Sequence, residues 1–254
     1  THRDSSAASD VYKRQIPDLE SQFLLFAVGG GLAQILATVC VILVFKSRNF
    51  AVGITLKKTE VILTALVGLI LIGEGVSTIS MFLICLGGAG VFFLSKKVSS
   101  VDRSNFSILN KSAVYGLLSG LLFAISAVCY RSATLSVVSD LVYLRAGFTL
   151  LIVILSQSFV MTIWLALFEP GQIKLVWLER KKGFWVGVTS LGGSFFWFTA
   201  FTLQNAAYVK AVGQIELIFS LLITTLFFKE RILNREILGM LLIGISALGL
   251  ILVV

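Results

Sequence analysis

The chain has 254 residues, of which 57% are hydrophobic and 13% are charged, with a mean hydropathy of +0.97 and a formal net charge of +8. Soluble globular domains have about 25% charged residues, so this composition excludes an ordinary soluble domain and predicts an integral membrane protein. The basic residues fall in short groups between apolar runs, which indicates topology signals and argues against nucleic-acid binding.

Residues 1–15, THRDSSAASDVYKRQ, are polar and contain neither an initiator Met nor the apolar stretch of a signal peptide. The end of this segment, DVYKRQ, is similar to the translation of a transposon adapter used in sequencing libraries. We therefore interpret residues 1–15 as a non-native tail and exclude them from the fold prediction. A gene interrupted by an adapter lacks its true beginning, so we expect the chain to be a fragment.

Eight apolar windows are each long enough to cross a hydrocarbon core of roughly 30 Å as a helix of about 20 residues. They cover residues 23–45, 50–72, 76–94, 113–134, 146–168, 183–201, 206–228 and 237–254. Helices are expected because backbone polar groups in lipid must be satisfied within the segment, and the period-2 pattern of a barrel is absent. The predicted fold is an all-α polytopic bundle with eight transmembrane helices.

Small residues recur at four-residue spacing in the fourth window, at Gly116, Gly120 and Ala124. Such a ridge lets two membrane helices approach closely. We therefore expect this face to pack against another helix.

An internal repeat emerges when the sequence is shifted against itself by 156 residues without a gap. The polar matches carry the argument, since such residues are few in the spans: Asn49 with Asn205, Glu60 with Glu216, and Glu74 with Glu230. The matched windows are the second and the seventh, so the chain passes through them in opposite directions. This predicts an inverted-topology repeat, which is typical of secondary transporters with sites near the midplane between the halves.

The stretches LVGLILIGEGVSTISMFLICLGGAG and LLITTLFFKERILNREILGMLLIGISALG resemble the end of the EamA repeat of the drug/metabolite transporter superfamily. In that pattern an apolar helix ends near Gly-Glu or Glu-Arg, and a short polar turn leads to a final helix with glycines. The resemblance implies two five-helix repeats in a ten-helix transporter, of which this chain lacks two helices. Residues 16–95 would hold the last three helices of the first repeat, residues 96–111 a basic linker, and residues 112–254 the complete second repeat.

Many members of this family carry a Glu-Pro pair ahead of the terminal glutamate. Glu60 and Glu216 match the acidic residue of that pair, whereas Val61 and Leu217 replace the proline. This departure argues against a proline-based hinge.

The resemblance implies a secondary transporter, a permease or exporter, in the bacterial cytoplasmic (inner) membrane. It would move a small metabolite, an amino acid or an amphipathic drug-like compound by alternating access, driven by a proton gradient or by exchange for a counter-substrate. No GxxxxGK[ST] motif for ATP occurs. The partners expected are the lipid bilayer and the small-molecule substrate.

Two other functions stay open, a membrane-embedded enzyme acting on lipid and a non-transporting membrane partner protein. His2 is the only histidine, so most hydrolytic mechanisms lack their base. We therefore expect no enzymatic activity, no catalytic residue, no metal site and no cofactor.

Glu60 and Glu216 are the main candidates for substrate or proton binding, because a carboxylate inside a membrane helix is costly and is usually kept for function. The alternative is a protonated glutamate that is hydrogen-bonded between helices. Thr64 and Ser220, four residues further on, share the face of their glutamates, although membrane hydroxyls often bond only to their own backbone.

Three further residues complete the candidate site. Lys57 stands three residues before Glu60 and is close enough to pair with it. Gln214 stands two residues before Glu216, and Trp197 belongs to an aromatic run that forms either a binding wall or simple packing. Lys58 and Lys210 are expected to extend toward the membrane interface.

Membrane orientation stays open. The short loops rich in Lys and Arg all fall on one side, which the positive-inside rule makes cytoplasmic. This places the C-terminus outside, whereas the family resemblance implies cytoplasmic termini.

Overall fold

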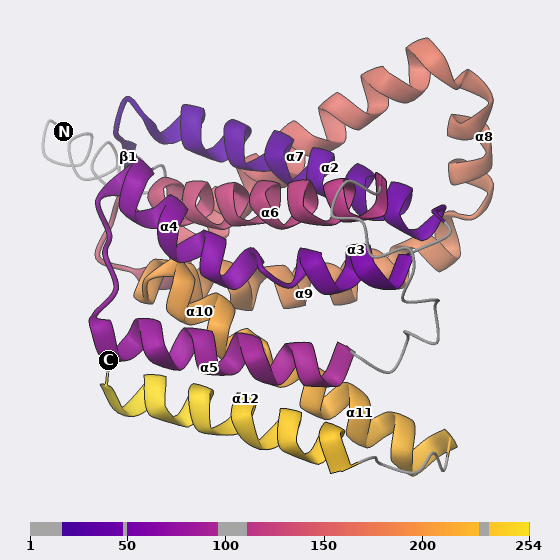
Figure 1. The fold of residues 1–254 in the computed structure, drawn as a ribbon. Coiled ribbons are helices and arrows are strands. Elements are labelled where there is room, and N and C mark those ends of the chain that lie inside the picture. Colours follow the sequence, from indigo (N-terminus) through magenta and orange to yellow (C-terminus); the bar gives the residue numbers. More distant parts are fainter. Residues whose placement is uncertain (1–16, 48–49, 96–110, 229–233, 254) are drawn as a thin grey trace, which may run out of the picture. The chain divides into compact units, whose positions relative to one another are not determined.

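The protein is almost entirely helical in the computed structural model, which describes residues 17–47, 50–95, 111–228 and 234–253 (Figure 1). The adapter-like tail, linker residues 96–110, Asn49 and Glu230 lie outside these described residues. Two short strands, β1 (Asp18–Leu19) and β2 (Val137–Val138), pair antiparallel. The predicted all-α class is confirmed.

Eleven helices make up the described part of the chain. They are α2 (Phe23–Phe45), α3 (Phe50–Lys57), α4 (Glu60–Ile72), α5 (Thr78–Ser95), α6 (Lys111–Leu135), α7 (Val142–Phe168), α8 (Pro170–Leu178), α9 (Arg180–Leu203), α10 (Ala206–Gly213), α11 (Ile215–Phe228) and α12 (Asn234–Val253).

Six segments within the described residues are long and apolar enough to cross a membrane, as expected of a polytopic membrane protein. They are Phe23–Phe45, Lys111–Leu135, Val142–Phe168, Arg180–Leu203, Ala206–Ile223 and Asn234–Val253. The helix over Thr78–Leu94 is apolar but shorter.

Two windows expected to form continuous helices are interrupted instead. The window over residues 50–72 divides into α3 and α4 at Lys58 and Thr59, and the window over residues 206–228 divides into α10 and α11 at Gln214. Hydropathy measures composition over a window, so it does not detect a local change in backbone hydrogen bonding.

The backbone at each interruption is tightened into i→i−3 hydrogen bonds, the pattern of a 3₁₀ turn. The Lys58 N–H donates to the Thr55 carbonyl at 3.2 Å, and the Thr59 N–H donates to the Leu56 carbonyl at 3.1 Å. At the second interruption the Gln214 N–H donates to the Ala211 carbonyl at 3.1 Å. Each interruption is therefore a local 3₁₀ turn in a backbone that stays right-handed, with Thr59 at φ −66°, ψ −7° and Gln214 at φ −62°, ψ −14°.

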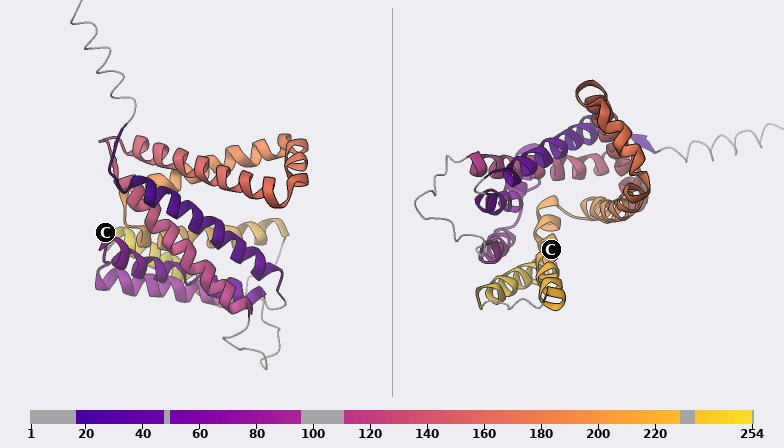
Figure 2. Two further views of the ribbon diagram at one scale, coloured as in Figure 1. Left: turned by 90° about the horizontal axis from the view of Figure 1, so that it is seen from above. Right: turned by 90° about the vertical axis from the view of Figure 1, so that its right-hand side faces the viewer.

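The contacts divide the chain into two units. Among the described residues, the first comprises those up to Gly31 together with Cys129–Leu203, and the second comprises those from Leu32 to Val128 and from Gln204 onward. In the first unit α7 and α9 lie side by side and α8 connects their ends (Figures 1 and 2). The Arg131 guanidinium donates to the carbonyls of Phe201 at 2.7 Å and Thr202 at 3.1 Å, which satisfies the last turn of α9.

In the second unit α5 and α12 lie along each other and run in opposite directions (Figure 1). Leu83 near the start of α5 contacts Gly249 near the end of α12, whereas Gly90 further along α5 contacts Gly239 near the start of α12. A methyl group at Gly90 would lie 2.7 Å from the Gly239 carbonyl oxygen. The Ser246 hydroxyl donates to the Leu83 carbonyl at 2.7 Å. Small residues thus allow close backbone packing, as in membrane helix pairs generally.

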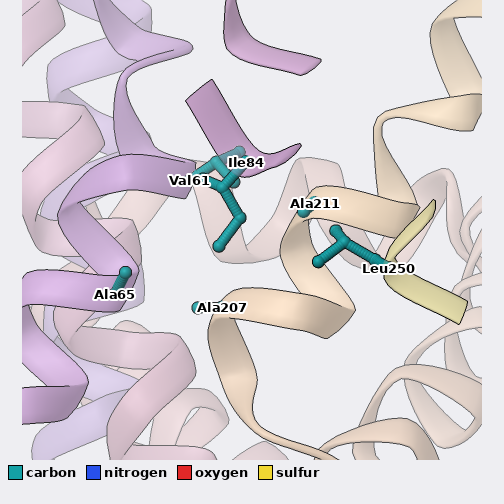
Figure 3. Close-up of a cluster of buried hydrophobic side chains, with 6 residues drawn as sticks. All are labelled: Val61, Ala65, Ile84, Ala207, Ala211 and Leu250. Atoms are coloured by element: carbon teal, nitrogen blue, oxygen red, sulfur yellow. The ribbon is translucent and has the colours of Figure 1, made fainter. Parts of the chain in front are cut away.

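A buried apolar cluster connects α4, α5, α10 and α12 (Figure 3). Its members are the side chains of Val61, Ala65, Ile84, Ala207, Ala211 and Leu250. The cluster holds the interrupted helices against the α5/α12 pair.

The predicted ridge of small residues packs against α3. Gly116 contacts the backbone of Gly53, and a methyl group at Gly120 would lie 2.9 Å from the Lys57 carbonyl oxygen. Ala124 is fully buried. The ridge therefore brings α6 against the first helix interruption.

Candidate functional site

Charged residues gather at the two helix interruptions in the second unit. Lys57 and Lys210 lie in the last turns of α3 and α10, whereas Glu60 and Glu216 lie in the first turns of α4 and α11. We call the following six residues the lysine–glutamate cluster: Lys57, Lys58, Glu60, Lys210, Gln214 and Glu216.

Glu60 lies between two ammonium groups. Its Oε2 is 3.8 Å from Lys57 Nζ and its Oε1 is 3.8 Å from Lys210 Nζ. Both ammonium groups also face the Phe123 ring, with Nζ of Lys57 4.7 Å and Nζ of Lys210 5.8 Å from the ring centroid. The Glu60 side chain is only 8% exposed, and its carboxylate has a lysine on either side. The Phe123 ring contacts both of these lysines.

Glu216 has a different environment. Its Oε1 lies 3.8 Å from Lys58 Nζ, but its side chain is 64% exposed while that of Lys58 is 16% exposed. The two glutamates are thus paired with different lysines, and only Glu60 is buried.

Two acceptors of the cluster are buried without a hydrogen bond among the described residues, Glu60 Oε2 and Gln214 Oε1. The Gln214 amide donates to the Lys210 carbonyl at 3.3 Å, which holds the side chain over the turn that carries Lys210. Buried polar atoms normally have a hydrogen-bond partner, so a ligand that donates a hydrogen bond could satisfy either of these two oxygens.

The remaining candidates lie as follows. Thr64 is fully buried and its hydroxyl donates to the Glu60 carbonyl at 2.6 Å, so it bonds to its own helix backbone. Ser220 lies on α11 and is exposed. Trp197 belongs to the first unit, on α9, with its ring centroid 5.7 Å from that of Phe201.

The structure brings together Lys57, Glu60, Gln214 and Glu216 within the second unit and adds residues that the sequence analysis did not assign to the site. Lys58 and Lys210 were expected to extend toward the interface, but each is 16% exposed and pairs with a glutamate. The position of Lys58 well inside an apolar window could have indicated this role. No sequence signal singled out Phe123, since its contact depends on how α6 packs.

The cluster contains three lysines and two glutamates, a formal surplus of one positive charge. Within the described ranges no three His, Cys, Asp or Glu side chains gather as a metal-ion set. Nearby ammonium groups repel cations, so the arrangement suits an acidic or neutral ligand better than a metal ion.

Comparisons with known proteins bear on the fold alone. No protein-family model matches the chain, and no curated protein matches it. A solved structure described only as "Crystal structure of protein" is similar, with a TM-score of 0.59 and 14% identity over 92% of this chain and 90% of that chain. At this identity the likeness indicates a shared fold.

Proposed function

We propose that this chain is a secondary transporter of the EamA-like class of the drug/metabolite transporter superfamily. It moves a small metabolite, amino acid or amphipathic compound across the bacterial cytoplasmic membrane by alternating access. The observation that carries the proposal is the interruption of two helices, each directly beside one of two repeat-matched glutamates. Sites of secondary transporters typically lie where helices at the interface of inverted repeats depart from regular geometry.

The helix bounds support the repeat. The last residues of α3 and α10, Lys57 and Gly213, lie 156 positions apart. In the proposed transporter, α3 and α4 together cross the membrane once and α5 crosses it once. With the six long segments, this gives eight membrane crossings.

The contacts between α5 and α12 support an inversion between the two copies. A methyl group at Gly87 would lie 2.6 Å from Ser246 Oγ, and one at Gly90 would lie 2.9 Å from Ile243 Cγ1. Positions 87 and 90 match positions 243 and 246 at the 156-residue offset, so the repeat operation exchanges the two contacts. Exchange of contacts is the property of a twofold-related interface.

In the proposed cycle the lysine–glutamate cluster is the site that opens alternately to the two sides. The solute competes with the internal ion pairs, and its binding or release biases the two halves toward one of two packings. A proton or a counter-substrate supplies the driving force.

Transport by the full chain in proteoliposomes tests this proposal. A panel of labelled amino acids, organic acids and sugars is screened under an imposed pH gradient and under counter-substrate exchange. Glu216→Gln should abolish uptake of the transported compound while the protein stays folded, because the exposed Glu216 carboxylate is not needed for packing. Glu179→Gln is the matched control, since Glu179 is 65% exposed and pairs with Lys182 outside the cluster.

A folded protein that moves no solute under any gradient would overturn the proposal. It would leave the membrane-embedded enzyme and the non-transporting partner as the remaining functions. Unchanged transport by the Glu216→Gln variant would remove this glutamate from the site.

A further inference from the structure

We infer that the lysine–glutamate cluster binds a soluble monocarboxylate that also carries a hydrogen-bond donor, such as a hydroxy acid. The inference deepens the proposed function and rests on it. It selects one class among the small metabolites, amino acids and amphipathic compounds that the fold alone leaves open.

The charge of the cluster indicates the sign of the ligand. Three lysines face two glutamates, and the side chains of Lys57, Lys58 and Lys210 are 23%, 16% and 16% exposed. Surplus charge that is partly withdrawn from water is costly unless it is compensated. One monoanion makes the cluster neutral, whereas an organic cation would raise its net charge to +2.

The distances show how loosely the two lysines hold Glu60. Lys57 and Lys210 each lie 3.8 Å from an oxygen of the same carboxylate, beyond the roughly 2.7–2.9 Å of a charge-assisted hydrogen bond. A solute carboxylate can therefore compete with Glu60 for these two lysines.

The buried acceptors indicate the second group of the ligand. Gln214 Oε1 and Glu60 Oε2 are buried and accept no hydrogen bond within the described residues. The Gln214 side chain bonds to the Lys210 backbone, so its free acceptor lies on the turn that supplies one of the ammonium groups. A hydroxyl on the solute would satisfy this acceptor without adding positive charge.

Binding of four small matched compounds to the full chain in phosphatidylcholine nanodiscs tests the inference. Lactate carries both groups, propionate lacks the hydroxyl, lactamide lacks the charge, and alaninol is a hydroxylated cation. We expect saturable binding of lactate, weaker binding of propionate, and no binding of lactamide or alaninol. Tighter binding of alaninol than of lactate, or no binding of lactate, would overturn the inference.

Variants separate the two recognition elements. Lys210→Gln should weaken lactate and propionate alike, by about tenfold, which corresponds to about 1.4 kcal/mol. Lys210→Arg should retain most of the affinity, and Gln214→Leu should remove only the preference for lactate over propionate. Lys174→Gln, on the exposed helix α8, is the control and should change nothing.

Glu60→Gln gives a result of opposite sign. Removing the internal carboxylate raises the surplus positive charge, so lactate should bind this variant more tightly than the wild type. Added lactate should therefore raise the thermal unfolding midpoint of the variant. A residue needed only for structure would weaken binding instead. Unchanged lactate affinity in both Lys210→Gln and Glu60→Gln would contradict the inference even if one variant were poorly stable.

Two further experiments distinguish a soluble ligand from a lipid headgroup, and the ligand class from the proposed transport function. Loss of lactate binding when phosphatidylglycerol is added to the nanodiscs would assign the anion site to a lipid headgroup and overturn the soluble ligand. Transport of a neutral or cationic solute by a protein that binds no lactate would overturn this inference and leave the proposed function standing. Lactate binding without transport of any solute would support the binding site and overturn the proposed transport function.

Discussion

Glu60 and Glu216 are equivalent in sequence but differ in their surroundings. The Glu60 side chain is 8% exposed and lies between Lys57 and Lys210, whereas the Glu216 side chain is 64% exposed and pairs with Lys58. The internal repeat could predict that the two acids match, and the i,i+3 spacing could predict the Lys57–Glu60 pair. Burial could not be predicted, because it depends on Lys210, which comes from a distant part of the chain.

Stability measurements should reveal this difference. Glu60→Gln leaves two poorly exposed ammonium groups without their shared carboxylate and should lower the free energy of unfolding by about 3 kcal/mol. Glu216→Gln breaks an exposed pair and should cost less than about 1 kcal/mol. Denaturant unfolding in detergent micelles gives both values, and equal costs would contradict the environments described here.

Gly73 ends α4 with a left-handed backbone, at φ 69°, and its N–H donates to the Gly68 carbonyl. A side chain at this φ is strained, so Gly73→Ala should destabilise the protein by about 1 kcal/mol. Gly75→Ala in the same turn is the control, since a methyl group there meets Leu69 only at an ordinary 3.7 Å. Thermal unfolding of the two variants side by side makes the comparison, and equal midpoints would argue against the strain.

At the scale of elements, hydropathy located most helices but not their internal structure. The predicted window over residues 23–45 matches α2 at both ends. The other windows agree with their helices to within a few residues wherever the structure describes the helix end. The two interruptions were missed because charged residues are few and apolar content stays high across them. Helix α8 was also missed, although Pro170 at its first position is a typical start signal.

The α5/α12 pair depends on glycine at the points of closest approach. A methyl group at Gly239 would lie 2.8 Å from the Gly90 carbonyl oxygen, so Gly239→Ala should push the helices apart and cost about 1–3 kcal/mol. Gly244 on the same helix has no atom of the described residues within 4 Å of that position. Gly244→Ala should therefore be neutral or stabilise by about 0.5–1 kcal/mol, and denaturant unfolding would show whether the two variants differ in sign.

At the scale of the whole molecule, the inverted repeat remains the prediction on which the transport mechanism depends. Polar matches at one offset predicted it, and the α5/α12 contacts exchange under the same offset. The sequence could not predict that α5 and α12 pack on each other, because an internal repeat states which segments are alike and not which ones touch. It also left the position of Trp197 undetermined with respect to the cluster.

A cross-link between α5 and α12 tests whether this pair forms the axis of the alternating movement. A Cβ at Gly87 would lie 3.1 Å from Ser246 Cβ, slightly inside the roughly 3.5–4.5 Å of a disulfide. Gly87→Cys with Ser246→Cys, in a chain whose exposed Cys85 is replaced by Ser, should form a disulfide and retain transport. Contacts on a rotation axis move least, so loss of transport that returns on reduction would show that the two helices slide.

The contact between Gly53 and Gly116 constrains how this protein can change over evolutionary time. Gly116 lies against the Gly53 backbone, and a methyl group at Gly53 would meet the Ser112 carbonyl oxygen at 2.6 Å, so neither position can enlarge alone. A lineage that acquires a larger residue at either position must shift α3, and with it Lys57, relative to the Phe123 ring on α6. Drift at a buried packing position would then be inherited as altered geometry of the lysine–glutamate cluster, and in the proposed transporter as altered solute preference, without any mutation among the charged residues themselves.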